Sequence, residues 1–348
     1  MTELAELGVW AREHLPPGVD SAAGGPAIAP LTGDAGFRHY YRLDTTPSLI
    51  AVFAPPQREN NPAFVTKGAA LAAAGVHVPR VHAVDYQRGF MLLEDLGDQL
   101  FLPLLDSGSV GHLYSRAEQS LALIQVASAD AQIFPPYSEH LLMEEMNLFE
   151  EWFATGLLAV ELDSSERRML EQTFAALAAS ALAQPRVVVH RDYHSRNLLQ
   201  LPDGGVGVID FQDAVVGPFS YDLVSLLKDC YIRWPVDLVR ARAVTFLRDA
   251  WCRHGKGGKV DDRQLLAWFD LMGLQRHIKV LGIFARLWLR DGKPRYLHDL
   301  PLVLRYTLEV TQHYTEFSPF HRWFEQRLMP VIVAQPWYRP WQQAGDTP

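Results

Sequence analysis

The spacing of hydrophobic and polar positions changes partway along the chain. Up to residue 93 the apolar residues form short runs at 48–54, 76–84 and 90–93, bounded by turn residues, as in β-strands. Helical spacing occurs there at 3–15 and again at 62–74, where Gly75 ends the pattern. After Gly97 the apolar residues recur at helical spacing. This spacing predicts helices near 111–129, 139–156, 164–182, 220–231, 235–254, 262–290 and 301–327.

This change of pattern predicts an α+β fold with two lobes. Residues 1–94 form a small β-rich lobe, and residues 95–348 form a larger, mainly helical lobe. The acidic break Glu94-Asp95-Leu96-Gly97 lies between them and is expected to be a hinge. A chain of 348 residues is long enough to bury a sizeable core.

The stretch 187–213, VVVHRDYHSRNLLQLPDGGVGVIDFQD, joins apolar runs to several polar residues. A buried strand leads into HRDYHSRN, and the sequence PDGG between two further apolar runs predicts a hairpin. Such a hairpin would bring Asp210 back to the end of the strands where Asn197 lies. Asp192, Asn197 and Asp210 would then supply the parts that phosphoryl transfer needs.

Phosphoryl transfer needs a group that orients the attacking hydroxyl, and oxygen ligands for Mg²⁺. Asp192 suits the first role, and Asn197 with Asp210 suits the second. The alternative is a charged surface loop followed by an ordinary hairpin. The order of the four polar positions, the hairpin and the apolar strand favours the enzyme.

Other segments offer binding or supporting residues. The segment 31–43 holds glycines whose backbone amides suit nucleotide phosphates, although many hairpins share this pattern. The nucleotide-binding candidates in it are Gly33, Asp34, Gly36, Phe37 and Arg38. Asp222, at a predicted helix start, either caps that helix or supports His190 and the catalytic loop.

Charged and polar residues of the helical lobe are candidates for holding an acceptor. Because buried charges are costly unless paired, the QRHIK sequence at 275–279 indicates a cleft wall or an ion pair with an acid such as Asp222 or Glu144. Glu145 is expected to be more exposed than Glu144. The acceptor-binding candidates are Arg191, His194, Arg196, Asp213, Glu144, Asn147, Gln275, Arg276 and Lys279.

Composition narrows the class of protein. A net charge of −8 argues against nucleic-acid binding, whose surfaces are basic. Cys230 and Cys252 lie far from any CxxC sequence, which argues against a zinc site or a disulfide framework. The N-terminus lacks a signal-peptide pattern, and the longest apolar stretch, 265–289, carries five charged or titratable residues. We therefore expect a cytoplasmic, monomeric protein that does not bind membranes.

With these motifs in view, the chain resembles the aminoglycoside phosphotransferase family, small-molecule kinases with a protein-kinase-like fold. The resemblance is strongest in HRDYHSRN, in VGVIDFQDA and at 218–223. It implies ATP as the donor, Asp192 as the catalytic aspartate, Asn197 and Asp210 as Mg²⁺ ligands, and Asp222 as a supporting residue. It also implies an adenine-binding hinge formed by Met91, Leu92, Leu93 and Glu94.

Within that family, GDAGFRHYYR, GFMLLEDLGD and GLQRHIKVLGIFARL resemble the bacterial anomeric sugar kinases of peptidoglycan recycling in the cell wall. The resemblance implies phosphorylation of N-acetylmuramate and N-acetylglucosamine at the anomeric hydroxyl. The α-1-phosphate of N-acetylmuramate would pass to an N-acetylmuramate-1-phosphate nucleotidyltransferase. The alternatives are a kinase for an aminoglycoside, choline or homoserine, and a non-catalytic ATP-binding kinase fold. The basic helix favours a neutral or anionic sugar.

One feature departs from the family pattern. Such kinases hold the ATP phosphates with a lysine on the third strand, paired to a glutamate on the next helix. Here the strand SLIAVFAPP has no basic residue, and the helix NNPAFVTKGAALAAAG has no glutamate. Arg38, Arg42 and Lys67 are the candidates to replace the lysine.

Overall fold

The chain forms two compact units in the computed structural model, which describes residues 3–21, 27–31, 36–255 and 257–346. Unit 1 comprises residues 1–134 and 196–214, and unit 2 comprises residues 135–195 and 215–348. Packing therefore groups residues 95–134 and 196–214 with the N-terminal sheet. The functional division at residue 94 remains a prediction.

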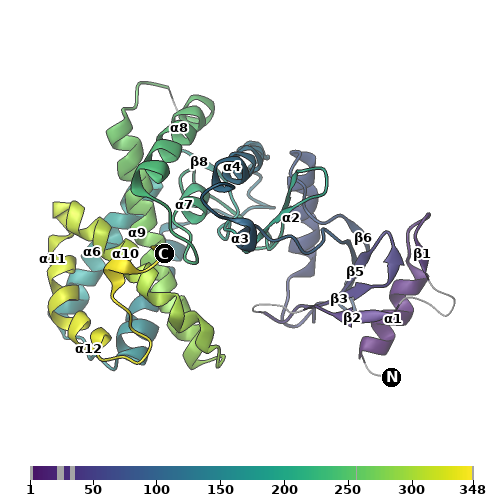
Figure 1. The fold of residues 1–348 in the computed structure, drawn as a ribbon, viewed down its shortest axis with the longest axis horizontal. Helices are drawn as coiled ribbons and strands as arrows, with labels where there is room; N and C mark the ends of the chain where they lie inside the picture. The colour runs from purple at the N-terminus through teal and green to yellow at the C-terminus, as the bar shows by residue number, and fades with distance from the viewer. Residues whose placement is uncertain (1–2, 22–26, 32–35, 256, 347–348) are drawn as a thin grey trace. The chain divides into compact units, whose positions relative to one another are not determined.

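Unit 1 is built around a five-stranded antiparallel sheet of order β2-β3-β5-β7-β6 (Figure 1). Its strands are β1 (Asp20–Ser21), β2 (Ile28–Pro30), β3 (His39–Leu43), β4 (Thr45–Thr46), β5 (Leu49–Phe53), β6 (Val81–Asp85), β7 (Phe90–Glu94), β9 (Leu198–Gln200) and β10 (Val206–Val208). Its helices are α1 (Glu3–Glu13), α2 (Asn61–Ala73), α3 (Phe101–Leu104) and α4 (Val110–Val126).

Helix α1 covers one face of the five-stranded sheet. Trp10 is buried against Leu43, Leu49 and Phe90 in one apolar cluster. Since successive side chains of a strand point to opposite faces, Leu43 and Tyr41 of β3 point toward α1. The intervening residues of β3 and of its neighbours therefore project from the opposite face.

The hairpin expected after the catalytic loop is confirmed. Strands β9 and β10 pair antiparallel with Leu198 opposite Val208, and Gly204 in the turn has φ +81°. The strand expected at 76–84 begins only at Val81. Pro79 explains the difference, because it has no N–H to donate to a strand ladder.

Unit 2 is mainly helical, with one two-stranded sheet made by β8 and β11. Its strands are β8 (Arg186–Val189) and β11 (Val215–Pro218). Its α-helices are α5 (Glu139–Leu148), α6 (Ser164–Leu182), α7 (Tyr221–Leu227), α8 (Val236–His254), α9 (Asp262–Leu289), α10 (Leu300–His313), α11 (Ser318–Trp323) and α12 (Met329–Val333). Shorter 3₁₀ or π segments are η1 (Phe149–Leu157), η2 (Pro294–His298), η3 (Thr315–Phe317), η4 (Phe324–Leu328) and η5 (Trp341–Gln343).

Helix α9 is the central element of unit 2, and it packs against α5, α6, α7, α8 and α10. It is buried on all sides over most of its length, as expected of a helix surrounded by others. At Gly282 the helix lies so close to α5 that an added Cβ would be 2.3 Å from the carbonyl carbon of Leu148. Among the described residues no helix, α9 included, combines the length and apolarity needed to cross a bilayer.

Two of the predicted helices are divided in the structure. The expected helix 139–156 changes at Phe149 from α5 to the π-helix η1. The expected helix 301–327 ends at His313, and a separate helix, α11, begins at Ser318 with Pro319 in its first turn. Proline fits a first turn but not a helix interior, because its ring replaces the N–H of an interior hydrogen bond.

Candidate active site

The hairpin of unit 1 brings Asn197 and Asp210 together, as the sequence predicts. The Ile209 N–H donates to the Asn197 carbonyl at 3.1 Å, and the Asn197 Nδ2 donates to the Asp210 carboxylate at 3.3 Å. Asp210 has φ +67°, a conformation that costs energy outside glycine. Such strain is concentrated at functional sites, where the surrounding structure maintains it.

Asn197 and Asp210 fit the oxygen-rich, weakly chelating type of site that Mg²⁺ prefers. Mg²⁺ is usually bound by one or two carboxylates, with water and phosphate completing its shell. No group of three or more His, Cys, Asp or Glu residues suited to a metal occurs in the described ranges. The Gln212 Nε2 donates to Asp210 at 2.7 Å and orients its carboxylate. The hairpin therefore offers Mg²⁺ the carboxylate of Asp210 and the amide oxygen of Asn197.

The catalytic loop of unit 2 is braced by Asp222 at the start of α7. Its carboxylate accepts the backbone N–H of His190 at 2.7 Å and that of Arg191 at 3.0 Å. Arg191 has φ +78°, so this bracing acts where the loop backbone is strained. Burial raises the pKa of Asp222 to about 7, although both N–H donors favour its ionised form.

Asp192 lies in a strongly positive environment. Burial tends to raise the pKa of its carboxyl, but the charges of Lys279, His194 and Arg191 outweigh burial and lower that pKa. The carboxylate therefore stays ionised at neutral pH. It is ready to accept a hydrogen bond from a hydroxyl group.

Glu145 of α5 is the acid that pairs with the basic residues of unit 2. Lys279 donates to its carboxylate at 2.9 Å, and Arg191 and Tyr137 donate to it as well. Lys279 also donates to the Tyr221 hydroxyl at 3.1 Å. Burial opposes ionisation of Glu145, yet Lys279 and Arg191 keep its pKa below the usual range. These two cations are thus held in place by one buried carboxylate.

The expectation that Glu145 is more exposed than Glu144 is wrong, and so is the choice of Asp222 or Glu144 as the ion-pair partner. Glu145 is 6% exposed, whereas Glu144 is exposed and lies 3.2 Å from His140. Asn147 is also exposed. The signal for Glu145 was its helical spacing, because Leu142 three residues before and Phe149 four residues after are both buried.

Helix α9 contributes two further buried polar residues. Gln275 is fully buried, and neither atom of its side-chain amide has a hydrogen-bond partner among the described residues. Arg276 is 3% exposed and donates to the Cys230 Sγ at 3.3 Å. Burial raises the pKa of Cys230 to about 11, so this partner is a neutral thiol.

The remaining candidates fall in both units. In unit 2, His190 is fully buried, and His194 is partly buried with its ring 5.4 Å from that of Tyr231. In unit 1, Arg196 is partly buried and Asp213 is exposed. The expected nucleotide contacts Gly33 and Asp34 lie outside the described residues.

The expected hinge segment is strand β7. Met91, Leu92 and Leu93 are buried in the sheet. Glu94 uses its side chain to hold the segment before β6, because one oxygen lies 3.0 Å from His77 and the other accepts the Arg80 N–H at 3.1 Å. The backbone of β7 pairs with β5 on one side and with β6 on the other, and the adenine role of this segment stays a prediction.

Arg38 and Glu59 form an ion pair on the sheet of unit 1. The Arg38 Nη2 lies 3.0 Å from a Glu59 oxygen, and the Phe37 N–H donates to the other oxygen at 3.1 Å. The guanidinium lies over the Phe64 ring, 5.1 Å from its centroid. Gly36 has φ +113°, which favours glycine.

Arg42 and Lys67 have well-defined partners of their own. Arg42 donates two hydrogen bonds to Asp95 and two to Asp98, at 2.6–3.0 Å. Lys67 is 6% exposed and donates to the carbonyls of Gln212 and Ala214 at 2.7 and 2.8 Å. Lys67 thereby fixes the backbone that follows Asp210.

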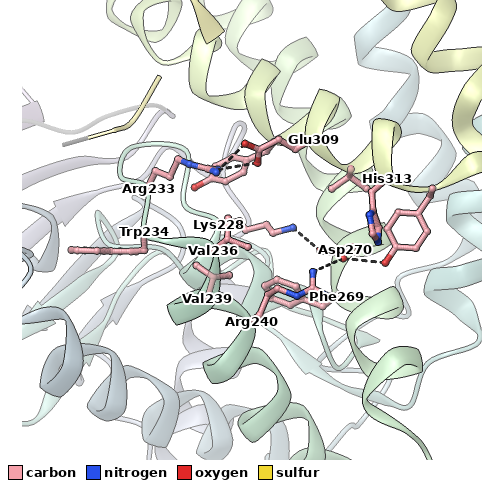
Figure 2. A pocket seen from close by; sticks show the side chains of 13 residues that line it. Lys228, Arg233, Trp234, Val236, Val239, Arg240, Phe269, Asp270, Glu309 and His313 are labelled. Carbon is pink, nitrogen blue, oxygen red and sulfur yellow. Dashed lines mark hydrogen bonds and ion pairs between the residues drawn. The ribbon is translucent and has the colours of Figure 1, made fainter. Parts of the chain in front are cut away.

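A cavity of about 230 Å³ lies between α8, α9 and α10 in unit 2 (Figure 2). Its charged groups point at one another: Lys228 and Arg240 meet Asp270, and Arg233 meets Glu309. The acceptor candidates named from the sequence are not among its lining residues. Asp229, which follows the lining residue Lys228, accepts the Ser195 N–H at 3.0 Å.

The amino-acid sequence of the chain is similar to those of named relatives. An N-acetylmuramate/N-acetylglucosamine kinase of Pseudomonas putida is 41% identical over 315 residues, covering 88% of this chain and 91% of the relative. The protein of the same name from Pseudomonas aeruginosa is 42% identical over 281 residues, covering 80% and 82%.

A solved structure and a family profile agree with these relatives. An amicoumacin kinase in complex with AMP-PNP, Ca²⁺ and Ami matches with a TM-score of 0.59 and 17% identity, covering 89% of this chain and 93% of that one. The fold is thus the protein-kinase-like fold of small-molecule kinases, with a small sheet-rich N-terminal part and a helical C-terminal part. The profile of the phosphotransferase enzyme family matches residues 27–257, and the chain belongs to that family.

Proposed function

We propose that this chain is an ATP-dependent kinase that phosphorylates N-acetylmuramate and N-acetylglucosamine at the anomeric hydroxyl, giving the α-1-phosphate. The names of the two Pseudomonas relatives, which align with most of the chain, support these substrates. The observation that carries the proposed chemistry is Asp192, a carboxylate kept ionised on a loop that Asp222 braces.

In the proposed reaction, Asp192 accepts a hydrogen bond from the anomeric hydroxyl and then its proton. The hydroxyl oxygen attacks the γ-phosphorus of ATP, the bond from that phosphorus to the β–γ bridging oxygen breaks, and ADP leaves. An anomeric hydroxyl is more acidic than an ordinary alcohol, because the ring oxygen stabilises its anion. A carboxylate with a lowered pKa is therefore an adequate base, and orientation is its main contribution.

The donor half of the reaction is assigned to unit 1. Asn197 and Asp210 would hold Mg²⁺, which when bound would offset the charge of the phosphates. The backbone of Met91, Leu92, Leu93 and Glu94 is assigned to adenine. The glycine segment with Gly33, Asp34, Gly36 and Phe37 is assigned to the phosphates. The AMP-PNP and Ca²⁺ named with the amicoumacin kinase support an ATP–divalent-cation donor.

The acceptor half of the reaction is assigned to unit 2. Lys279, Arg191 and Arg276 make the surroundings of Asp192 positive. N-acetylmuramate carries a lactyl carboxylate, whereas choline and aminoglycosides are cations, so charge complementarity favours the sugar acid. His194 and Gln275 are assigned to the uncharged parts of the acceptor. Glu144 and Asn147 of unit 2, and Arg196 and Asp213 of unit 1, are proposed for the same role.

The proposed product sets the wider role of the protein. The α-1-phosphate of N-acetylmuramate would be consumed by an N-acetylmuramate-1-phosphate nucleotidyltransferase in peptidoglycan recycling. We further propose that the protein acts in the cytoplasm, and as a monomer.

An ATP-coupled screen of amino sugars, choline and aminoglycosides tests the proposal, with ³¹P NMR of the product. We expect turnover with the two amino sugars and an anomeric phosphate signal. Asp192→Asn should lower kcat by about 10³-fold while AMP-PNP still binds. The matched control is Asp237→Asn, an exposed acid on α8. Turnover confined to choline or an aminoglycoside would reject the sugar assignment, and full activity of Asp192→Asn would reject the base.

A further inference from the structure

The residues that usually hold the phosphates of ATP in a kinase-like fold are missing from their usual elements. Strand β5 contains no cation, and helix α2 contains no glutamate. A triphosphate nevertheless needs positive charge near its β- and γ-phosphates. Arg38, Arg42 and Lys67 of unit 1 are the candidates to supply that charge.

Two of the three are committed to other partners. Arg42 meets the carboxylates of Asp95 and Asp98 with four charge-assisted hydrogen bonds. Lys67 is buried and directs its ammonium at two backbone carbonyls. Moving either cation toward a ligand would leave buried or paired groups unsatisfied.

Arg38 differs because it is fixed in place but keeps donor capacity. Its side chain is 7% exposed, with Glu59 at one nitrogen and the Phe64 ring beneath the guanidinium. Its Nε–H is buried and has no hydrogen-bond partner within the described residues. A buried donor without a partner in a native protein calls for a specific explanation, and a ligand acceptor is one.

Ring packing and electrostatics link Arg38 to Asp210, one of the proposed metal ligands. Arg38 is two residues before Tyr40 and therefore projects from the same face as Tyr40, opposite the face that α1 covers. Phe64, under the guanidinium, packs at 4.8 Å from Phe211, the residue after Asp210. Arg38 and Asp210 both act electrostatically on the Tyr40 hydroxyl, whose pKa burial raises to about 12.

The register of the sheet explains how this pair replaces the missing one. Tyr40 pairs directly with Val52 of β5, so Arg38, the residue just before β3, is on the side of the sheet to which Val52 points. Glu59 comes two residues before α2 rather than inside it. The cation therefore comes from the segment before β3 instead of from β5, the carboxylate comes from the loop before α2, and the two form an ion pair.

We propose that the Arg38 guanidinium, held by Glu59 and Phe64, binds the β- and γ-phosphates of ATP in place of the absent strand lysine. This inference rests on the proposed function only in taking ATP as the donor. A guanidinium offers two parallel N–H groups to a phosphate, where a lysine offers a point charge.

Isothermal titration of the full-length protein tests the assignment, with Mg²⁺–AMP-PNP and, separately, adenosine as probes. Arg38→Ala should weaken AMP-PNP binding by about 30-fold and leave adenosine binding within about twofold of wild type. Arg38→Gln carries the same expectation and keeps the volume of the site. Glu59→Gln should raise the KM for ATP by about fivefold without changing the sugar KM, because it loosens the arginine but keeps an acceptor for the Phe37 N–H.

Arg88→Ala is a closely matched control. Arg88 also combines a carboxylate partner, Asp85 at 2.7 Å, with an aromatic ring, Phe90 at 5.2 Å, at the turn between β6 and β7. It should bind AMP-PNP as wild type does.

The outcomes separate this inference from the proposed function. Wild-type affinity of Arg38→Ala for AMP-PNP would overturn the inference, and so would an equal loss of AMP-PNP and adenosine binding. If wild type binds AMP-PNP but phosphorylates no amino sugar, the sugar assignment fails. The selective loss in Arg38→Ala would still support the phosphate contact.

Discussion

The carboxylate of Asp222 accepts the backbone N–H of Arg191 at 3.0 Å, at a residue whose φ is +78°. The same carboxylate accepts the N–H of His190 at 2.7 Å. A single buried side chain therefore satisfies two consecutive N–H groups of a strained loop, immediately before Asp192. The position of the proposed catalytic carboxylate depends on this contact.

Asp222→Asn should disturb the loop that holds His190 and Arg191, although Asp222 is not itself proposed to contact a substrate. The amide oxygen can accept one of the two N–H groups, while the amide NH₂ would face the other. We expect the free energy of unfolding at pH 7.5 to fall by about 2 kcal/mol, measured by urea denaturation. The kcat should fall by about tenfold with little change in the KM for ATP. An unchanged kcat would show that the contact does not position Asp192.

The pH dependence of stability gives a second test of Asp222. Its pKa is raised to about 7 in the folded protein, above the value of about 3.9 of an unperturbed aspartate. The folded state therefore binds more protons between these values, and its contribution to stability is lost as pH rises through about 7. The destabilisation caused by Asp222→Asn should be at least about 1 kcal/mol larger at pH 5 than at pH 8. A constant difference across this range would contradict the raised pKa.

The close approach of α9 and α5 predicts a strong effect of one methyl group. In Gly282→Ala the new Cβ would lie 2.3 Å from the carbonyl carbon of Leu148, so the two backbones must separate. We expect a loss of about 3 kcal/mol of unfolding free energy. The control is Gly111→Ala on α4, where nothing lies within 4 Å of the added Cβ, and alanine should be neutral or stabilising by up to about 1 kcal/mol. Equal stabilities of the two variants would contradict the tight crossing.

Short-range sequence patterns predict much of the part of the site that is assigned to Mg²⁺ and ATP. The hairpin β9–β10 follows from its turn residues and strand spacing, and it fixes Asn197 beside Asp210 at short range along the chain. Pro319 in the sequence also indicates the break in the predicted helix 301–327. Pro79 likewise indicates that the strand begins only after it, at Val81. These errors came from weighting hydrophobic spacing above the missing N–H of proline.

Long-range pairing was harder to predict. Glu145 meets Lys279 across 134 positions of the chain, and neither residue alone reveals its partner. The helical spacing of Glu145 relative to Leu142 and Phe149 does place it on the buried side of α5. The pair Arg38–Glu59 depends on the sheet register and on the path into α2, which the sequence pattern does not specify.

Replacing Asp210 should separate metal chemistry from folding. Asn tolerates a positive φ better than most residues, so Asp210→Asn keeps the backbone while removing the charge. We expect kcat to fall by about 10²-fold or more, and a higher Mg²⁺ concentration to be needed for half-maximal activity. The thermal midpoint should stay within about 3 °C of wild type. Wild-type dependence on Mg²⁺ in this variant would exclude Asp210 as a ligand.

Removing the charge of Lys279 should move the acid limb of the pH–rate profile. Lys279 is the first of the charges that lower the pKa of Asp192 against burial, so Asp192 stays ionised to unusually low pH in the wild type. Lys279→Gln keeps a donor for Glu145 and Tyr221 but raises the pKa of Asp192. The acid limb of kcat/KM should then shift to higher pH. Lys259→Gln, at an exposed lysine of the same unit, should leave the limb in place. If the acid limb does not move in Lys279→Gln, Asp192 is not the group whose ionisation limits the reaction. This conclusion holds whether or not the sugar KM changes.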